Sequence, residues 1–255
     1  EIDGLFCGSG SYIGIESNSC ECLIVDEAHR LNEKSGLYGN KGENQIKEVI
    51  AAARCSVFFI DEDQRVTLKD IGSKASIREW AHKQGAEVHE MALESQFRCG
   101  GSDGYLAWLD HVLDIRTTAN TDLNDVGYDF GVCDTATSLR AMIEAKNGEP
   151  NTKARLVAGY CWKWNSKTDA SAYDIEFPAE GFQMQWNLAS DSSLWIMKED
   201  SINQVGCIHT CQGLEIDYVG VIIGPDLLIR DGKVVTDPSK RASSDKSVFG
   251  WKKRM

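Results

Sequence analysis

Residues 22–29 read CLIVDEAH and residues 57–64 read VFFIDEDQ, so two short apolar runs each end abruptly in acidic residues. Between them, four apolar residues recur at the spacing of one helix face: Ile46, Val49, Ile50 and Ala53. This pattern predicts two buried strands joined by a helix over about 43–54, which is a β-α-β unit. Both strands would deliver acids at their carboxyl ends, where open α/β sheets hold ligands.

Strand-like runs alternate with helical patterns along the rest of the chain, which indicates an α/β protein with a mostly parallel sheet. Further helices are expected at 76–85, with a capping box from Ser76 to Glu79, at 105–113 and at 135–146. The last of these is expected to face inward with Leu139, Met142 and Ile143. Further strands are expected at 88–93, 128–133, 156–160, 205–209 and 218–223, and a hairpin at 229–235. The polar, Gly-rich stretch around 95–104 predicts a domain boundary.

The composition is that of an ordinary globular protein, with 42% apolar and 26% charged residues. No run approaches the roughly 18 apolar residues of a membrane span, and the start, EIDG, shows no signal peptide. Nine cysteines without a C-x-x-C pair favour a reduced, cytoplasmic compartment over disulfides or structural zinc. The net charge of −12 counts against a simple nucleic-acid-binding surface, although a groove with local positive charge is compatible with it.

The acids at the two strand ends are the first candidates for chemistry. ATP hydrolysis needs one carboxylate to hold Mg²⁺ and another to orient the attacking water. Asp26 and Glu27 could divide these roles, because adjacent residues leaving a strand point in different directions. Gln64 could donate a hydrogen bond to a γ-phosphate, and Arg98, near the expected domain boundary, could neutralise charge built up in phosphoryl transfer.

A further candidate is the stretch 207–215, which follows an apolar strand and reads CIHTCQGLE. Gly213 would let backbone N–H groups approach a phosphate, and Glu215 could accept a hydrogen bond from a ribose hydroxyl. Each motif alone also has a simpler interpretation, as an acidic turn, a surface arginine or an ordinary connection between strands.

Four of the seven tryptophans lie in an irregular stretch, at Trp162, Trp164, Trp186 and Trp195. Beside Lys163 and Lys167 they could stack on unpaired bases. The favoured interpretation is a hydrophobic cluster under a long loop.

Taken in order, the strings DEAH, IDEDQ, QFR and HTCQGLEIDYV resemble motifs two to five of superfamily-one helicases. More narrowly, LIVDEAHRL, SQFRC and HTCQGLEIDYVGVIIGPDL are similar to the Schlafen-like DNA/RNA helicase domain, over about residues 8–251. This resemblance implies two RecA-like parallel-sheet domains with ATP in the cleft between them. The first would cover 1–97, incomplete at its N-terminus, and the second 98–255.

The resemblance also implies a role for each matching residue of the hydrolytic centre. Asp26 would hold Mg²⁺ through water, and Glu27 would activate the hydrolytic water. Gln64 would sense the γ-phosphate, and Arg98 would be the arginine finger.

The second half of the chain would complete the nucleotide site and connect it to nucleic acid. Gly213 and Glu215 would lie near the sugar and the phosphates of ATP. His209, Thr210 and Gln212 would couple that site to a bound single strand of DNA or RNA.

The sequence departs from the superfamily pattern at three points. Ile60 stands where Gly is usual in motif three, and Cys207 where Thr is usual in motif five. The phosphate-binding loop G-x-x-x-x-G-K-[ST] does not occur, since the only Gly-Lys pair, at 232–233, lacks the required neighbours. The final, Arg-bearing motif is also missing. A fragment of a longer polypeptide is therefore expected, one that binds ATP poorly by itself.

Two alternatives stay open at this point. A metal-dependent nuclease could use Asp26, Glu27, Asp61 and Asp63 as a two-metal carboxylate cluster. A non-catalytic RecA-like scaffold that binds a protein partner would equally explain the missing phosphate-binding loop.

Overall fold

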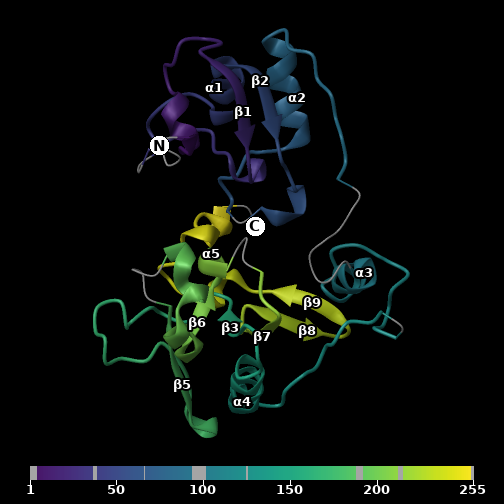
Figure 1. The fold of residues 1–255 in the computed structure, drawn as a ribbon, viewed down its shortest axis with the longest axis vertical. Coiled ribbons are helices and arrows are strands. Elements are labelled where there is room, and N and C mark those ends of the chain that lie inside the picture. The colour runs from purple at the N-terminus through teal and green to yellow at the C-terminus, as the bar shows by residue number, and fades with distance from the viewer. Residues whose placement is uncertain are drawn as a thin grey trace. The chain divides into compact units, whose positions relative to one another are not determined.

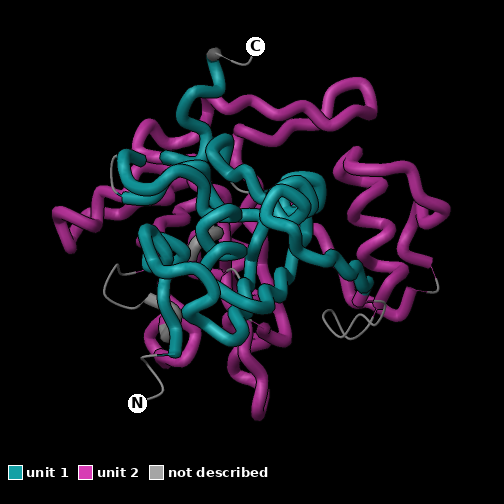
Figure 2. Tube along the Cα trace, turned by 90° about the horizontal axis from the view of Figure 1, so that it is seen from above, with its two compact units in different colours: residues 1–92, 246–255 teal, residues 93–245 magenta. Residues whose placement is uncertain are grey.

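The computed structural model describes residues 5–36, 39–65, 67–93, 102–124, 126–187, 192–211 and 215–253. The chain forms two compact units, drawn in different colours in Figure 2. Unit 1 comprises Glu1–Ala92 together with Lys246–Met255, and unit 2 comprises Leu93–Asp245. The assignment of RecA-like domains to 1–97 and 98–255 stays a prediction.

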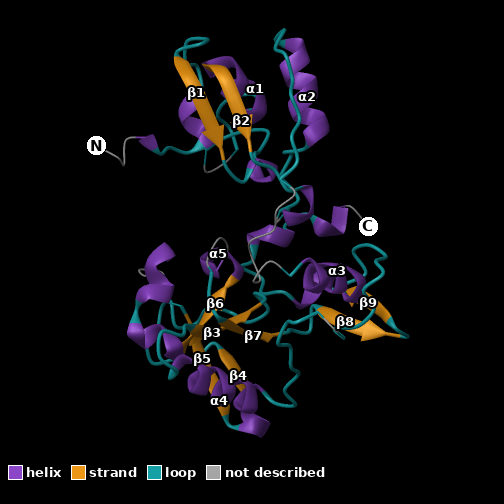
Figure 3. Ribbon diagram, turned by 45° about the vertical axis from the view of Figure 1, so that its right-hand side comes forward, coloured by secondary structure: helices purple, strands orange, loops and turns teal. Residues whose placement is uncertain are grey.

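Unit 1 is built on the predicted β-α-β unit. Strand β1 (Cys20–Val25) lies parallel to β2 (Ala53–Phe58), and α1 (Gln45–Ala52) connects them (Figure 3). Asn44 begins the helix, because its side chain accepts hydrogen bonds from the backbone N–H groups of Ile46 and Lys47. The prediction of a parallel pair joined by a helix is confirmed, although the helix ends before Ala53.

The two strands are covered on one face only, so the prediction of fully buried strands was wrong. Ala28, Leu31 and Ile46 form a small buried cluster, and partly buried side chains from β1, β2, α1 and α2 pack against it. On the other face, Ile24 is 71% exposed and Val57 is 39% exposed. The alternation of side chains along a strand therefore separates a packed face from an open one in the described part of unit 1.

Helix α2 (Lys74–Lys83) begins one turn earlier than the sequence predicted. Ser73, not Ser76, caps it, because the Ser73 hydroxyl oxygen accepts a hydrogen bond from the Ser76 N–H at 3.0 Å. Gly85, with φ +71°, ends the helical segment as expected. The strand predicted at 88–93 does not form, and Met91 is 95% exposed in a segment without regular secondary structure.

Unit 2 contains a five-stranded sheet in the order β4-β5-β6-β3-β7, in which β5, β6, β3 and β7 are parallel and β4 is antiparallel to β5. Its strands are β3 (Ala154–Ala158), β4 (Ile175–Phe177), β5 (Phe182–Trp186), β6 (Gln204–Cys207) and β7 (Tyr218–Ile222). Its helices are α3 (Asp103–Val112), α4 (Ala136–Asn147) and the short α5 (Ile208–Cys211) (Figure 1). The predicted hairpin is formed by β8 (Leu227–Arg230) and β9 (Lys233–Thr236).

Close packing of α4 on the sheet depends on Gly220 in β7. A Cβ atom at this position would lie 2.7 Å from side-chain atoms of Ile143 in α4 and of Leu156 in β3. Ile143 is buried and Leu139 packs against the same core, as predicted, but Met142 is 53% exposed and does not face inward.

Two further predictions for unit 2 were wrong. Residues 128–133 form no strand, and the Tyr128 ring instead stacks on Tyr105 of α3 with 3.7 Å between ring centroids. The stretch with four tryptophans contains the β4–β5 hairpin, and Trp186 and Trp195 are buried. Trp186 belongs to the core of the sheet, and Trp162 and Trp164 are partly buried against that core. Hydrophobic packing is therefore confirmed for these three side chains, but in the main core of unit 2 and not in a separate cluster under a loop.

Short 3-10 helices connect these elements. In unit 1 they are Ser9–Tyr12, Ala28–Arg30, Glu62–Gln64, Lys246–Val248 and Trp251–Lys253. In unit 2 they are Pro178–Glu180, Ser192–Met197, Glu199–Asn203 and Pro238–Lys240. The chain is thus an α/β protein with parallel sheets. No helix in the described segments has the length and apolar character needed to cross a bilayer.

Candidate functional site

The acidic residues predicted from the sequence emerge at one edge of the β1–β2 pair. Val25, the last residue of β1, is in register with Phe58, the last residue of β2. Beyond these residues, Phe59 N–H donates to the Val25 carbonyl at 2.9 Å, and Ala28 N–H donates to the Phe59 carbonyl at 2.9 Å. These two hydrogen bonds hold the segments that carry Asp26 and Asp61 beside each other.

Glu27 has a strained backbone, with φ +52° and ψ +40° in the left-handed region. A non-Gly residue there costs about 1–2 kcal/mol. The Asp26 carboxylate accepts a hydrogen bond from the Glu27 N–H at 2.9 Å, which supports the turn. Asp26 is exposed, whereas Glu27 is half-buried against His29, so the two carboxylates have different surroundings.

Replacing Glu27 by Gly is expected to leave the free energy of unfolding unchanged or to raise it by up to about 1.5 kcal/mol. The reason is that relief of the left-handed strain exceeds or balances the backbone entropy cost of glycine, about 0.5–1 kcal/mol. The exposed Glu33 has no positive φ, so Glu33→Gly should cost that entropy without any relief. Urea unfolding of both variants measures the difference, and a loss above about 1 kcal/mol for Glu27→Gly would contradict the strain.

His29 connects the two strand ends, although the sequence did not single it out. Its side chain is 2% exposed. Asp61 N–H donates to His29 Nδ1 at 3.4 Å, which assigns the proton of a neutral ring to Nε2. Nε2 lies 3.3 Å from Glu27 Oε2, a close contact that is not aligned as a hydrogen bond. His29 therefore spans from the backbone of the second strand end to the carboxylate of the first.

The second strand end carries its own hydrogen-bonded turn. Asp61 Oδ1 accepts from Asp63 N–H at 3.1 Å, and Asp61 Oδ2 accepts from Gln64 Nε2 at 2.8 Å. Gln64 is exposed. A continuous path of contacts thus runs from Glu27 through His29 and Asp61 to the amide of Gln64.

The donor set at this edge fits a divalent cation held by substrate oxygens better than one held by protein alone. In the described residues, no three His, Cys, Asp or Glu side chains come close enough to hold a metal ion. The four acids considered for a two-metal nuclease therefore do not form a cluster. Mg²⁺ is usually bound by one or two carboxylates together with phosphate and water, and the exposed Asp26 suits that arrangement.

Of the residues predicted in unit 2, Thr210 lies in α5, directly after β6. Thr210 is half-buried, with its hydroxyl 3.3 Å from the Cys207 thiol, and Glu215 is exposed. Burial, together with a smaller effect of the neighbouring Cys207, raises the pKa of the Cys211 thiol to about 12, so Cys211 remains a neutral thiol rather than a nucleophile. The side chain of His209 and all of Arg98, Gln212 and Gly213 lie outside the described residues.

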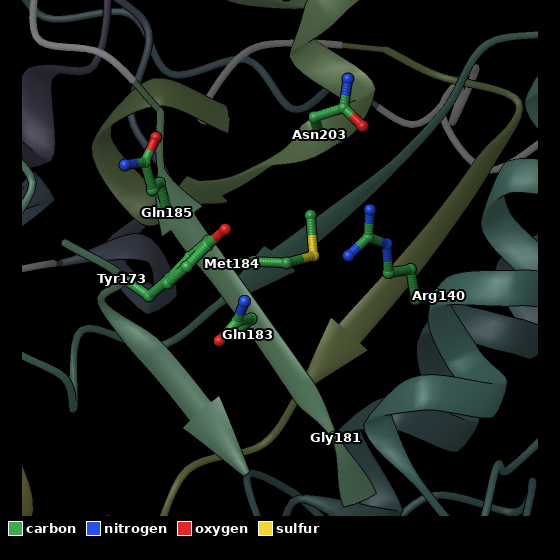
Figure 4. Close-up of a pocket in the computed structure, with 7 residues that line it drawn as sticks. All are labelled: Arg140, Tyr173, Gly181, Gln183, Met184, Gln185 and Asn203. Carbon is green, nitrogen blue, oxygen red and sulfur yellow. The ribbon is translucent and has the colours of Figure 1, made fainter. Parts of the chain in front are cut away.

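An open cavity of about 470 Å³ in unit 2 does not involve the predicted residues. Figure 4 shows Arg140 entering it from α4 and three side chains from β5: Gln183, Met184 and Gln185. The Arg140 guanidinium already donates to Glu144 at 2.7 Å. The candidate chemistry of the chain therefore centres on the edge of β1 and β2.

Comparison with known proteins identifies the family. An uncharacterized protein of Saccharomyces cerevisiae is 24% identical over 225 residues, which cover 80% of this chain and 49% of that protein. The chain thus spans about half the length of this curated relative. No solved structure matches the chain. The sequence model of Schlafen group 3, DNA/RNA helicase domain, matches residues 1–255, which confirms the resemblance carried by the DEAH, QFR and HTCQGLE motifs. The chain belongs to the Schlafen group 3 DNA/RNA helicase domain family.

Proposed function

We propose that the chain is part of an ATP-driven motor that moves on single-stranded DNA or RNA, and that its two units are RecA-like domains. The observation that supports this most is the shared edge of β1 and β2, where Asp26, Glu27 and Gln64 emerge from neighbouring parallel strands. Ligand sites of open α/β sheets lie at this end of the strands. The family match supplies the nucleic-acid helicase character.

In this proposal the residues of unit 1 perform the hydrolytic step. Mg²⁺ bound with ATP would neutralise charge on the phosphates. Asp26 would hold the ion through water, and Glu27 would orient the attacking water and accept its proton. Gln64 would donate to the γ-phosphate, for which its amide must exchange its present acceptor, Asp61, for a phosphate oxygen.

Unit 2 would contribute the remaining groups. Arg98 would act as the arginine finger, and Gly213 and Glu215 would approach the sugar and phosphates. His209, Thr210 and Gln212 would transmit the state of that site to the strand. A reducing, cytoplasmic compartment belongs to the same proposal, supported by the cysteines of the described segments, all of which are free thiols.

ATP turnover by the natural protein that contains these 255 residues tests the proposal. Hydrolysis should require Mg²⁺ and should accelerate when single-stranded oligonucleotide is added. Cleavage of the oligonucleotide with Mg²⁺ or Mn²⁺ in the absence of ATP would favour the nuclease instead. Absence of any strand-stimulated ATP turnover would refute the motor.

His29 is expected to be a positioning residue for Glu27, and two substitutions separate its two contacts. Asn at this position keeps an acceptor near the place of Nδ1 but has no group near Nε2, whereas Gln keeps a donor near Nε2. We expect His29→Asn to lower kcat for ATP by up to about 100-fold with KM unchanged, since a displacement of a catalytic group by about 1 Å can cost about 10²-fold.

His29→Gln should retain more of the turnover than His29→Asn, because it can still reach the Glu27 carboxylate. His82 at the end of α2 provides the control, since His82→Asn removes an imidazole that lies outside this path of contacts. Equal losses of kcat in the Asn and Gln variants would show that burial of the ring, rather than its contact with Glu27, is what matters.

A further inference from the structure

Unit 1 contains a cavity of about 260 Å³ that the proposed nucleotide site does not use. It is lined by residues from three separate stretches of sequence: Arg30, Asn32, Thr67, Lys69, Asp70, Lys246 and Phe249. Three of these side chains are cationic and one is acidic. In a chain with net charge −12, this is a local concentration of positive charge.

The acidic member of the lining is already engaged. Asp70 Oδ1 accepts from the Thr67 hydroxyl at 2.7 Å, and Asp70 Oδ2 accepts from Thr67 N–H at 2.8 Å. Lys69 and Lys246 are exposed, and neither forms an ion pair within the described residues. Their ammonium groups are therefore available to an anion from solution.

An aromatic side chain stands beside these cations. Phe249 is 53% exposed at the cavity, although burial of a phenyl ring would be favourable. Positive charge that follows a phosphate backbone, combined with an exposed ring on which a base can stack, is the combination by which proteins hold single strands. The volume lies just below the ~300 Å³ lower end of small-molecule pockets, which suits a phosphate with part of a nucleotide.

The backbone next to Lys69 and Asp70 is in close contact with the segment that follows Glu27. Ile71 N–H donates to the Leu31 carbonyl at 2.8 Å, and Asn32 bridges to Asp70. At Gly72, an added Cβ atom would lie 1.9 Å from the Ala28 carbonyl oxygen, so the two segments are in closest contact there. A ligand in the cavity would thus touch the same rigid piece of backbone that continues from the DEAH motif.

We propose that this cavity is a subsite for single-stranded nucleic acid, in which Arg30, Lys69 and Lys246 contact a backbone phosphate and Phe249 stacks on the adjoining base. The proposal rests on the strand binding in the proposed function and deepens it by naming the residues that hold the strand. It also assigns a function to the Lys246–Met255 segment, which none of the helicase motifs includes.

Strand binding by the chain, measured without ATP, tests the subsite. We would follow the fluorescence anisotropy of a labelled single strand of roughly 16 nucleotides, a length within the reach of one binding domain. The double variant Lys69→Ala/Lys246→Ala should bind about tenfold more weakly. Its plot of log affinity against log salt should be shallower by up to about 0.7, since the cations of the cavity contact one phosphate and each neutralised phosphate contributes about 0.7. Phe249→Ala should also bind about tenfold more weakly, with the salt slope unchanged.

Lys83→Ala is the control for the loss of a lysine charge from unit 1, because Lys83 lies in α2, outside the cavity lining. Photocrosslinking of a strand that contains 5-bromouracil adds a readout on the unaltered protein, and the peptide that carries Phe249 should be labelled. Affinity and slope equal to wild type in both cavity variants would overturn the subsite, as would a wild-type chain that binds no strand.

Competitors separate the sources of the anion. Inorganic phosphate should displace the strand only weakly. Complete displacement by phosphate, where chloride of the same ionic strength leaves the strand bound, would show a site for free phosphate instead. If polyglutamate displaced the labelled strand as well as unlabelled strand does, and if Phe249→Ala did not change the affinity for the strand, the site would be one for an acidic protein partner. That result would overturn the proposal. Failure of ATP turnover would refute the motor and leave the subsite standing, because these measurements contain no ATP.

Discussion

Replacing Glu27 by Gln is expected to lower ATP turnover by the natural protein by roughly 10²–10⁴-fold, the contribution of a positioned general base. Gln has nearly the same shape as Glu, but its amide cannot accept the proton of the attacking water. Asp26, which would hold Mg²⁺, is unchanged, so the affinity for ATP–Mg²⁺ should stay close to that of the wild type. Steady-state turnover and nucleotide affinity, measured on the same preparation, separate the two effects.

The matched control for this prediction is Glu33→Gln. Glu33 is an exposed carboxylate on the same connection, outside the path from Glu27 through His29 to Gln64. The Glu33→Gln variant should hydrolyse ATP at the wild-type rate. If Glu27→Gln hydrolysed ATP as fast as Glu33→Gln, Glu27 would not be the base, and the assignment of the DEAH residues would fail.

The β-α-β unit could be predicted from the sequence because its information is local. An apolar run, a helical period and a second apolar run follow one another within residues 22–60, and the structure forms a strand, a helix and a strand in that order. What the sequence could not give was the extent of burial. An apolar run looks the same whether one face or both faces of a strand are covered, so the open face with Ile24 and Val57 appeared only in the structure.

Two features of unit 2 were missed for different reasons, one because a tertiary contact overrode local propensity and the other because the turn lacks a recognised local signal. Residues 128–133 have the aromatic and β-branched character of a strand, yet Tyr128 stacks on Tyr105 and no neighbouring strand pairs with the segment in the described residues. The β4–β5 hairpin was missed because Gly181, with φ +66°, turns the chain after a 3-10 helix rather than within a two-residue turn signal.

The candidate site also contains residues that could be predicted from the sequence and residues that only the structure identifies. Asp26, Glu27 and Gln64 could be proposed from their positions at strand ends. His29 could not, because only the pairing of β1 with β2 brings Asp61 N–H to its ring. The cavity lined by Arg30, Lys69 and Lys246 could not be predicted from the sequence either, because these residues are far apart in the chain and the chain as a whole is acidic.

Replacing Trp186 by Ala is expected to destabilise unit 2 by about 3–5 kcal/mol, the cost of truncating a fully buried large aromatic side chain. Trp186 is 0% exposed and belongs to the core of the sheet. Its ring meets Tyr160 edge-on, with 5.6 Å between ring centroids, and its Nε1 donates to the Trp162 carbonyl at 3.3 Å. At ~2 kcal/mol/M in urea, the unfolding midpoint should fall by roughly 1.5–2.5 M. Hydrogen exchange in β5 and β6 identifies the transition that belongs to unit 2.

Tyr173→Ala is the companion variant, because Tyr173 is an aromatic residue of the same region that is 40% exposed, and its loss should cost much less. The comparison also decides between the two interpretations of the tryptophan-rich stretch. A buried ring cannot stack on a base without leaving the core, so Trp186→Ala should change strand affinity only through unfolding. If Trp186→Ala kept the wild-type unfolding midpoint but lost affinity for single strands, Trp186 would lie on the binding surface. The assignment of Trp186 to the core of unit 2 would then be wrong.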